Sequence, residues 1–392
     1  MRAAVVALAG FASAWPNAAA AASDATPLAA GRVIQVGAQR PLRTPSAAAA
    51  VARDGDSIEI DAGDYTGDVA IWTQDRLTIR AVGGRARMVA AGASAEGKAI
   101  WVIRGGAMLL ENLDFMGARA AHRNGAGIRF ERGRLTLRNC LFDDNENGIL
   151  TSGDRAAELH IEGSEFGNNG FGDGYSHNLY VGTIRKLTVI GSYFHHARIG
   201  HLLKSRAAEN HILYNRLTDE AGGSASYELE FPSGGLAYVV GNLIAQGART
   251  DNPTVVSFGA EGYAWPRNEL YLVNNTLVDD LPNGGRFLAV KPGNARVFAV
   301  NNLLVGRGTL DAAGAGDYRN NFNVDPTGFV DAARYDYRLV SASPLTGRGI
   351  AQGTANGVDL TPRREYVHPR QTRASSGGTQ PSNPGYRLGQ AN

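Results

Sequence analysis

Ionisable and polar side chains gather in one part of the sequence, between Asp173 and Phe231. They fall on three short segments, 177–181, 201–206 and 227–231, in which they alternate with apolar residues. Successive side chains of a strand point to opposite faces, so polar residues that alternate with apolar ones share a face. We therefore expect one wall of polar side chains that can hold a charged ligand and transfer protons.

The alternation assigns each candidate to a face. Because Leu179, Leu203 and Leu229 point inward, their immediate neighbours point outward. The outward residues expected on this basis are Asn178, Tyr180, Leu202, Lys204, Arg206, Glu228 and Glu230. His201 is expected to point inward or to lie at the entry of its strand. Lys204 is one of only four lysines in a chain whose other basic residues are arginines.

A repeated pattern of short strands explains how these segments come together. An apolar strand, then Asn or Gly, then an apolar or aromatic residue recurs around positions 112, 139, 163, 191, 215, 242, 275 and 302, which lie 24 to 33 residues apart. A period in the twenties is typical of a solenoid. A second short strand lies between the copies, without helical periodicity. The sequence thus predicts an all-β, single-stranded right-handed parallel β-helix with coils about 4.8 Å apart.

Asparagine in the same turn of successive coils has a physical reason. Its side chain tolerates a left-handed backbone and can bond to an asparagine one coil away. We therefore expect Asn139, Asn215, Asn242, Asn275 and Asn302 to occupy similar turns.

The segments on either side of the repeat differ in composition. Residues 1–23 have the features of a signal peptide, with Arg2, an apolar run and small residues suited to cleavage, and the run is too short to span a bilayer. We expect a secreted or periplasmic protein without a membrane span. Residues 24–55 are predicted to form an N-terminal segment with a capping helix that begins at Thr44-Pro45-Ser46. The coil is expected over residues 56–345, followed by a C-terminal extension, 346–373, and a disordered tail, 374–392.

The overall composition limits the classes of partner. The net charge of +2 gives no argument for a nucleic-acid partner, and the single cysteine excludes an intramolecular disulfide. The 50 glycines fall between short apolar runs, as expected for turns. We expect a monomer that is stabilised by the stacking of its coils.

Two stretches resemble a known superfamily. The sequence GDSIEIDAGDY at 55–65 resembles the entry coil of pectate-lyase-like β-helix proteins, and Tyr337-Arg338-Leu339 with Ser343-Pro344-Leu345 is similar to their closing segment. Within the polar region, Lys204-Ser205-Arg206 and then Asn210 to Asn215 resemble the "NKS…NTIxxN" stretch of chondroitinase-B and alginate-lyase-type enzymes.

This resemblance implies a polysaccharide lyase. In that family a lysine removes the proton beside the uronate carboxylate, an arginine on the next coil assists, and calcium neutralises the carboxylate. Lys204 falls on that lysine. The strand that carries the family's arginine corresponds to 227–231, which has none, so Arg206 is the expected substitute.

The remaining candidates receive roles from the same chemistry. Tyr180 or His177 would donate a proton to the leaving oxygen, and positive charge from Arg206 and His201 would favour the neutral amine of the base. Asn178, Glu228 and Glu230 would bind substrate. Glu228 and Glu230 with Asp173 supply the hard oxygen ligands that suit calcium, the one cofactor expected.

Other functions fit the same wall. A mannuronan-epimerase-like enzyme uses the same proton abstraction without elimination, and a non-catalytic carbohydrate-binding or scaffold protein needs only the binding surface. A hydrolase of the polygalacturonase kind would need a cluster of aspartates that the sequence does not show. The sequence therefore predicts a lyase acting on an acidic polysaccharide, with the epimerase and the binding protein as alternatives.

Overall fold

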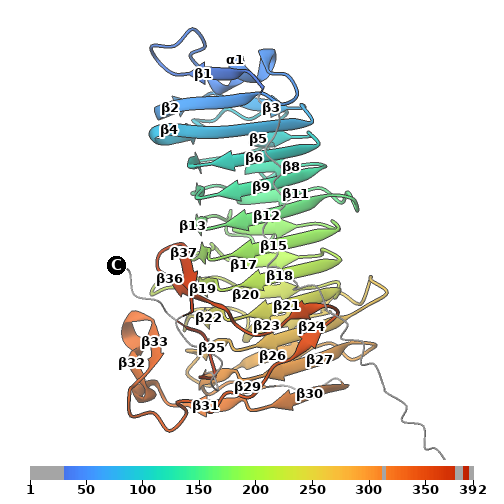
Figure 1. The fold of residues 1–392 in the computed structure, drawn as a ribbon, viewed down its shortest axis with the longest axis vertical. Coiled ribbons are helices and arrows are strands. Elements are labelled where there is room, and N and C mark those ends of the chain that lie inside the picture. Colours follow the sequence, from blue (N-terminus) through green and yellow to red (C-terminus); the bar gives the residue numbers. More distant parts are fainter. Residues whose placement is uncertain (1–30, 311–314, 376–382, 388–392) are drawn as a thin grey trace, which may run out of the picture.

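The computed structural model describes residues 31–310, 315–375 and 383–387, and most of them form one right-handed coil of parallel strands (Figure 1). Each turn of the chain visits three faces and then stacks on the turn before it. The predicted all-β parallel β-helix is confirmed. The predicted signal peptide, 1–23, lies outside the described residues.

One face is a sheet of ten strands, which we call the ten-stranded wall. Its strands are β3 (Ala70–Trp72), β5 (Ala99–Ile103), β8 (Ala126–Phe130), β11 (Asn147–Thr151), β14 (Leu179–Val181), β17 (His201–Ser205), β20 (Tyr227–Phe231), β23 (Thr254–Phe258), β26 (Arg286–Val290) and β29 (Thr309–Leu310). The three polar segments of the sequence are β14, β17 and β20, so they lie next to one another.

The other two faces belong to one sheet of 21 strands. The second face contains β6 (Ala107–Glu111), β9 (Arg134–Arg138), β12 (Glu158–Glu162), β15 (Lys186–Ile190), β18 (Glu209–Leu213), β21 (Leu236–Val240), β24 (Glu269–Val273), β27 (Arg296–Val300) and β30 (Ala315–Arg319). The third contains β7 (Leu113–Met116), β10 (Leu141–Asp143), β13 (Glu165–Gly167), β16 (Tyr193–Phe194), β19 (Arg216–Thr218), β22 (Leu243–Gln246), β25 (Thr276–Asp279), β28 (Leu303–Gly306) and β31 (Phe322–Val324). The first coils use β1 (Val33–Val36) and the long strands β2 (Ser57–Thr66) and β4 (Arg76–Val89).

A short helix, α1 (Pro45–Val51), lies at the N-terminal end of the coil (Figure 1). The Thr44 side chain accepts a hydrogen bond from the Ala47 amide, which confirms the predicted N-cap. Ala48 is fully buried against the first coil, so the helix covers the open end of the apolar interior. Among the described residues no helix is long and apolar enough to cross a membrane.

The limits of the coil differ from those expected. Parallel pairing already begins at β1, which pairs with β2, and it ends with β31, so the coil runs from Val33 to Val324 rather than over 56–345. The chain then leaves the coil through η1 (Pro326–Gly328), β32 (Phe329–Asp331), η2 (Ala332–Arg334) and β33 (Asp336–Leu339). The strands β32 and β33 pair in antiparallel fashion, because the chain has turned away from the stack.

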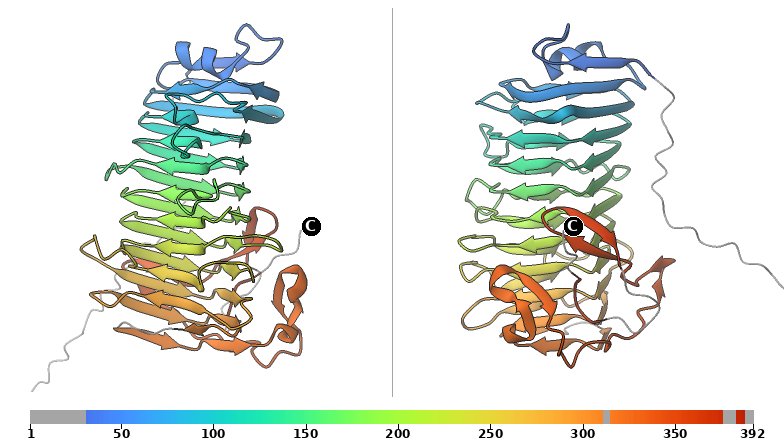
Figure 2. Two further views of the ribbon diagram at one scale, coloured as in Figure 1. Left: turned by 180° about the vertical axis from the view of Figure 1, so that it is seen from behind. Right: turned by 60° about the vertical axis from the view of Figure 1, so that its left-hand side comes forward.

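The remaining C-terminal residues return along the side of the coil (Figures 1 and 2). They form two antiparallel pairs, β34 (Thr354–Ala355) with β35 (Val358–Asp359) and β36 (Arg364–Val367) with β37 (Gln371–Ala374). Within the tail that we expected to be disordered, residues 383–387 are described, and Tyr386 is buried with its ring 6.3 Å from that of Tyr366. This segment is ordered because an aromatic side chain anchors it, and residues 376–382 and 388–392 lie outside the described residues.

Apolar and amide side chains form continuous columns inside the coil. The rings of Phe115, Phe142, Phe166 and Phe194 stack with centroid separations of 5.2, 4.7 and 4.6 Å. At another turn Asn215, Asn242, Asn275, Asn302 and Asn321 form a buried ladder in which each side-chain amide donates to the next at 2.8 to 3.1 Å. Each Oδ1 from Asn242 to Asn321 also accepts the backbone N–H of the ladder asparagine one coil earlier, so the ladder closes the turn in the coils that it lines.

All five predicted asparagines lie in the same turn of their coils, but only four of them belong to the buried ladder. Asn139 lies one position earlier than the buried column, in left-handed backbone at φ 50°. The buried column in its coil is occupied by Cys140, and the next two coils use Ser164 and Ser192. The turn thus has two adjacent positions that favour asparagine for different reasons, one for its backbone and one for its side chain.

We predict that Asn242→Ala lowers the free energy of unfolding by at least about 2 kcal/mol, since each buried polar group that loses its partner costs about 1–3 kcal/mol. The substitution removes the acceptor of the Asn215 backbone N–H, one of the two acceptors of Asn215 Nδ2, and the side-chain donor to the Ile212 carbonyl. Thermal and urea unfolding measure the effect. Asn283→Ala, at an exposed turn, is the control and should change stability by under about 0.5 kcal/mol. Equal effects of the two substitutions would contradict a stabilising ladder.

Candidate functional site

Three of the predicted residues lie in one row on the outside of the ten-stranded wall. Tyr180 of β14 is in register with Lys204 of β17, which is in register with Glu230 of β20. The row continues to Ser257 and then Ala289, one residue per coil. Since coils are about 4.8 Å apart, neighbouring members of the row are within reach of one small ligand.

Lys204 lies between two carboxylates. Its Nζ atom is 3.1 Å from Oε2 of Glu230 and 3.3 Å from Oε1 of Glu261, and its side chain is only 13% exposed. Glu230 belongs to the neighbouring strand, whereas Glu261 lies in the loop that follows β23. Lys204 is therefore ion-paired in the ligand-free protein.

Arg206 shares the second of these carboxylates. Its Nη2 atom is 2.7 Å from Oε1 and 2.8 Å from Oε2 of Glu261, and Nε is 3.2 Å from Oε2. Its Nη1 donates to the hydroxyl of Tyr180, and the guanidinium lies 5.1 Å from the centre of the tyrosine ring. Arg206 thus links Tyr180 to Glu261, at the side of the row. The sequence did not predict Glu261, because it lies in a loop 55 residues after Arg206 and no local pattern indicates that the two residues are in contact.

Two histidines lie at the entry of the same strands. Burial lowers the pKa of His177 well below its usual value, and Nδ1 of this ring accepts the backbone N–H of His201 at 3.0 Å. Nδ1 of His201 lies 3.0 Å from Oε2 of Glu230, and burial lowers the pKa of His201 despite this carboxylate. Both rings are therefore neutral at neutral pH. A His201 tautomer with its proton on Nδ1, toward Glu230, leaves Nε2 as a proton acceptor.

The row of side chains leads into a trough on the same wall. The trough has a volume of about 430 Å³ and is lined by Tyr227, Thr254, Ser257, Phe258, Ala260, Arg286, Ala289, Val290, Lys291 and Pro292. Ser257 and Ala289 belong to the row and are small, whereas Arg286 and Lys291 are exposed cations. Neither cation forms an ion pair with any residue in the described part of the chain. The trough therefore presents unpaired positive charge.

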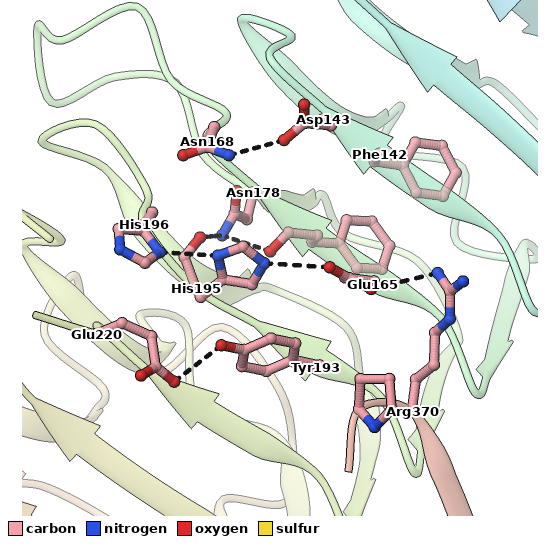
Figure 3. A network of polar contacts seen from close by, with 12 residues as sticks. Phe142, Asp143, Glu165, Asn168, Asn178, Tyr193, His195, His196, Glu220 and Arg370 are labelled. Atoms are coloured by element: carbon pink, nitrogen blue, oxygen red, sulfur yellow. Dashed lines mark hydrogen bonds and ion pairs between the residues drawn. The ribbon is translucent and has the colours of Figure 1, made fainter. Parts of the chain in front are cut away.

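The predicted orientation of Asn178 was wrong. Its side chain is fully buried, and Nδ2 donates to the carbonyls of Phe166 and His195 at 3.2 and 2.8 Å, as its position beside His195 in Figure 3 indicates. At the entry of the strands of this wall two consecutive side chains point inward, as for Leu202 and Leu203, which both belong to the apolar core. The same column contains Gly148, where an added Cβ would lie 2.9 Å from the ring of Phe166 in the interior. Asn178 therefore does not lie on the outer surface of the wall.

The predicted orientation of Glu228 was wrong for the same reason. Glu228 shares the inward column with Asn178 and Leu202, all of them fully buried. Burial raises the pKa of Glu228 well above its usual value, and the nearby carboxylates of Asp219 and Asp279 act in the same direction. Burial also raises the pKa of Asp219, to about 6. Glu228 thus lies near the carboxylates of Asp219 and Asp279, whereas Glu230 lies beside Lys204.

The predicted calcium ligands do not converge. Glu228 and Glu230 have different surroundings, and Oδ1 of Asp173 accepts the Tyr175 amide of its own loop at 3.0 Å. Among the described residues no group of three or more acidic, histidine or cysteine side chains could hold a metal ion. These residues do not fit the calcium of the resembled lyases.

A second polar cluster lies on the third face, where the C-terminal pair β36–β37 meets the coil (Figure 3). Nδ1 of His195 is 2.8 Å from Nδ1 of His196, and its Nε2 is 3.4 Å from Glu165. The same carboxylate is 3.3 Å from Arg370, which follows β36. The sequence did not predict this cluster, because Arg370 lies more than 170 residues from its partners. The contacts attach the C-terminal segment to the coil.

Comparison with known proteins identifies the fold. No family model matches the chain, and no curated protein matches it. Among solved structures, the pectate lyase Pel9A superposes with a TM-score of 0.57 at 12% identity, over 85% of this chain and 96% of that chain. The chain has the pectate-lyase-like β-helix fold. A pectin methylesterase from Aspergillus niger also matches, with a TM-score of 0.38 at 12% identity over 76% of this chain and 91% of that chain.

At this level of identity the likeness concerns the fold, so the site must be judged from its own geometry. The coil places Tyr180, Lys204 and Arg206 together on the outer surface, with His177 and His201 at the entry of the same strands. It adds Glu261 and the trough, and it removes Asn178 and Glu228 from the outer surface.

We predict that Glu228→Gln makes the protein more stable than the wild type at high pH and changes little at low pH. A carboxyl whose pKa is raised on folding contributes stability that is lost as the pH rises from its unfolded pKa through its folded pKa. For Asp219, a rise from 3.8 to about 6 corresponds to a loss of about 3 kcal/mol across that window, and Asp219→Asn should remove it. Thermal unfolding between pH 4 and 8 measures both effects. Parallel curves for wild type and Glu228→Gln would contradict the prediction, and Glu111→Gln, on a partly exposed strand position, is the control.

Proposed function

We propose that the ten-stranded wall binds an acidic, uronate-containing polysaccharide and cleaves it by β-elimination. The observation that carries the proposal is the continuity of the row with the trough. Lys204 and Arg206 stand at one end, and the unpaired cations Arg286 and Lys291 flank the trough up to three coils, about 14 Å, further along. An anionic chain laid across the coils would meet positive charge at both ends.

The reaction places definite demands on the wall. A base removes the proton from the carbon beside the uronate carboxylate, the electron pair forms a carbon–carbon double bond, and the bond to the leaving oxygen breaks. The leaving oxygen then takes a proton. Negative charge grows on the carboxylate during proton removal, so cations placed there stabilise the transition state. Arg206 is suited to this role, because its planar guanidinium binds both oxygens of a carboxylate.

Two arrangements of the base fit the wall. The resemblance to alginate-lyase-type enzymes makes Lys204 the base, which requires it to lose the proton that its two carboxylate partners stabilise. In the other arrangement Lys204 stays charged and binds the substrate carboxylate, and His201, oriented by Glu230, accepts the proton at Nε2. The hydroxyl of Tyr180 supplies the proton for the leaving oxygen in both.

An assay with defined polymers tests the function. The solved neighbour is named a pectate lyase, so polygalacturonate is the first probe, followed by alginate and chondroitin sulfate. A lyase yields an unsaturated uronate, whose absorbance rises with time. Exchange of the proton with solvent, without absorbance, would indicate an epimerase. Binding without either would support the carbohydrate-binding alternative, and neither binding nor turnover on any uronate polymer would refute the proposal.

The variant Lys204→Arg separates the two arrangements of the base. If Lys204 is the base, the variant should lose nearly all activity, at least about 100-fold in kcat, because guanidinium stays protonated and general base catalysis contributes about 10² to 10⁴. If Lys204 binds the carboxylate, the variant should retain most of its kcat, and His201→Gln should abolish turnover instead. Thermal unfolding checks that each variant is folded, and Lys98→Arg, in the turn before β5 and also paired with carboxylates, is the matched control.

A further inference from the structure

We propose that Glu261 is an internal stand-in for the substrate carboxylate, and that a uronate binds by displacing it from Arg206 and Lys204. The inference rests on the proposed function and deepens it, because it identifies the point where the sugar's carboxylate is recognised. It also makes Glu261 a determinant of which acidic ligands the wall accepts.

The first support is the geometry of the ion pair. The two oxygens of Glu261 meet Nη2 and Nε of Arg206 at 2.7 to 3.2 Å, and one of them also lies 3.3 Å from Lys204. A guanidinium in contact with both oxygens of one carboxylate is the arrangement that gives arginine its specificity for carboxylate ligands. The space between the two cations therefore has the shape and charge that a single carboxylate needs.

The second support is the difference between the two carboxylates at Lys204. The side chain of Glu230 belongs to the wall itself and is only 4% exposed, whereas that of Glu261 comes from a loop and is 48% exposed. Exposed ion pairs contribute little to stability, because water competes for both partners. Glu261 can therefore turn toward water without disturbing the wall, while Glu230 stays in place to hold Lys204 and His201.

The third support is the fixed backbone beneath Glu261. Its amide donates to the Pro232 carbonyl at 2.9 Å, and the Trp265 indole donates to the Arg206 carbonyl at 3.1 Å. The hydroxyl of Tyr263 donates to the Lys291 carbonyl. Exchange of carboxylates thus requires only a side-chain rotation. The residue before Glu261, Ala260, lines the trough, so the carboxylate stands at its edge.

This arrangement has a consequence for specificity. A small carboxylate gains only what Glu261 already provides, so its net gain on binding is small. A polymer that also contacts Arg286 and Lys291 along the trough gains additional interactions. We infer that the wall selects acidic chains over free uronic acids, and that removal of the Glu261 charge weakens this selection.

The test compares wild type with Glu261→Gln, using titration calorimetry with a galacturonate tetramer and with free galacturonate. We expect the variant to bind the tetramer about 2- to 10-fold more tightly, and free galacturonate to bind measurably only to the variant. In the lyase assay the variant should show a lower KM. Glu96→Gln is the matched control, because Glu96 also bridges a lysine and an arginine, Lys98 and Arg104, away from the trough.

The outcomes separate this inference from the proposed function. If wild type and Glu261→Gln bind the tetramer equally, the stand-in role is wrong and the proposed function remains. If neither binds any uronate, the proposed function is wrong; acetate then tests the recognition point alone, by raising the melting temperature of Glu261→Gln but not of wild type or Glu96→Gln. If acetate stabilises all three alike, or if the variant binds the tetramer more weakly, the inference is overturned.

Discussion

The stacking of parallel strands at one fixed spacing is the constraint on which the rest of this structure depends. Each side chain has as its nearest neighbour the residue at the same position of the next coil, some 20 to 35 residues away in the sequence. A residue type that packs or bonds well with a copy of itself is therefore favourable along the whole column, because each side chain contacts the same side chain in the coils before and after it. The phenylalanine stack and the asparagine ladder both follow from this, and the ladder also provides partners for the amides of every turn that it lines.

The same constraint builds the polar wall. Tyr180, Lys204 and Glu230 form a row only because three coils are in strict register. The charges of this row are then balanced by side chains from outside it. Glu261 balances Arg206 and Lys204 from a loop, and the buried histidines lose much of their basicity because little water reaches them. A wall assembled in this way keeps a carboxylate at its cationic end even before any ligand is present.

One inward column changes from amide to carboxyl side chains along the coil. In one coil Nδ2 of Asn169 donates to Oδ1 of Asn178 inside the turn at 2.8 Å, and Nδ2 of Asn178 donates to backbone carbonyls. Two coils later Glu228 takes the place of Asn178, and Asp219 lies nearby. Two carboxylates cannot both be ionised in a dry interior, so at least one must keep its proton. Burial is the main cause that raises the pKa values of Glu228 and Asp219, and the Asp219 carboxylate adds to the effect on Glu228. Their protonation becomes part of the stability of the coil.

The sequence by itself determined the period, the parallel coil, the N-capped helix and the outer row from Tyr180 to Glu230, because those depend on local alternation and on repetition along the chain. Only the tertiary structure decided which way Asn178 and Glu228 point, since strict alternation of faces fails at the entry of these strands, where two consecutive side chains point inward. It also decided the partners of Arg206 and Glu165. Glu261 and Arg370 reach those partners from a loop and from the returning C-terminal segment, and the position of such segments depends on contacts between distant parts of the chain rather than on any local pattern.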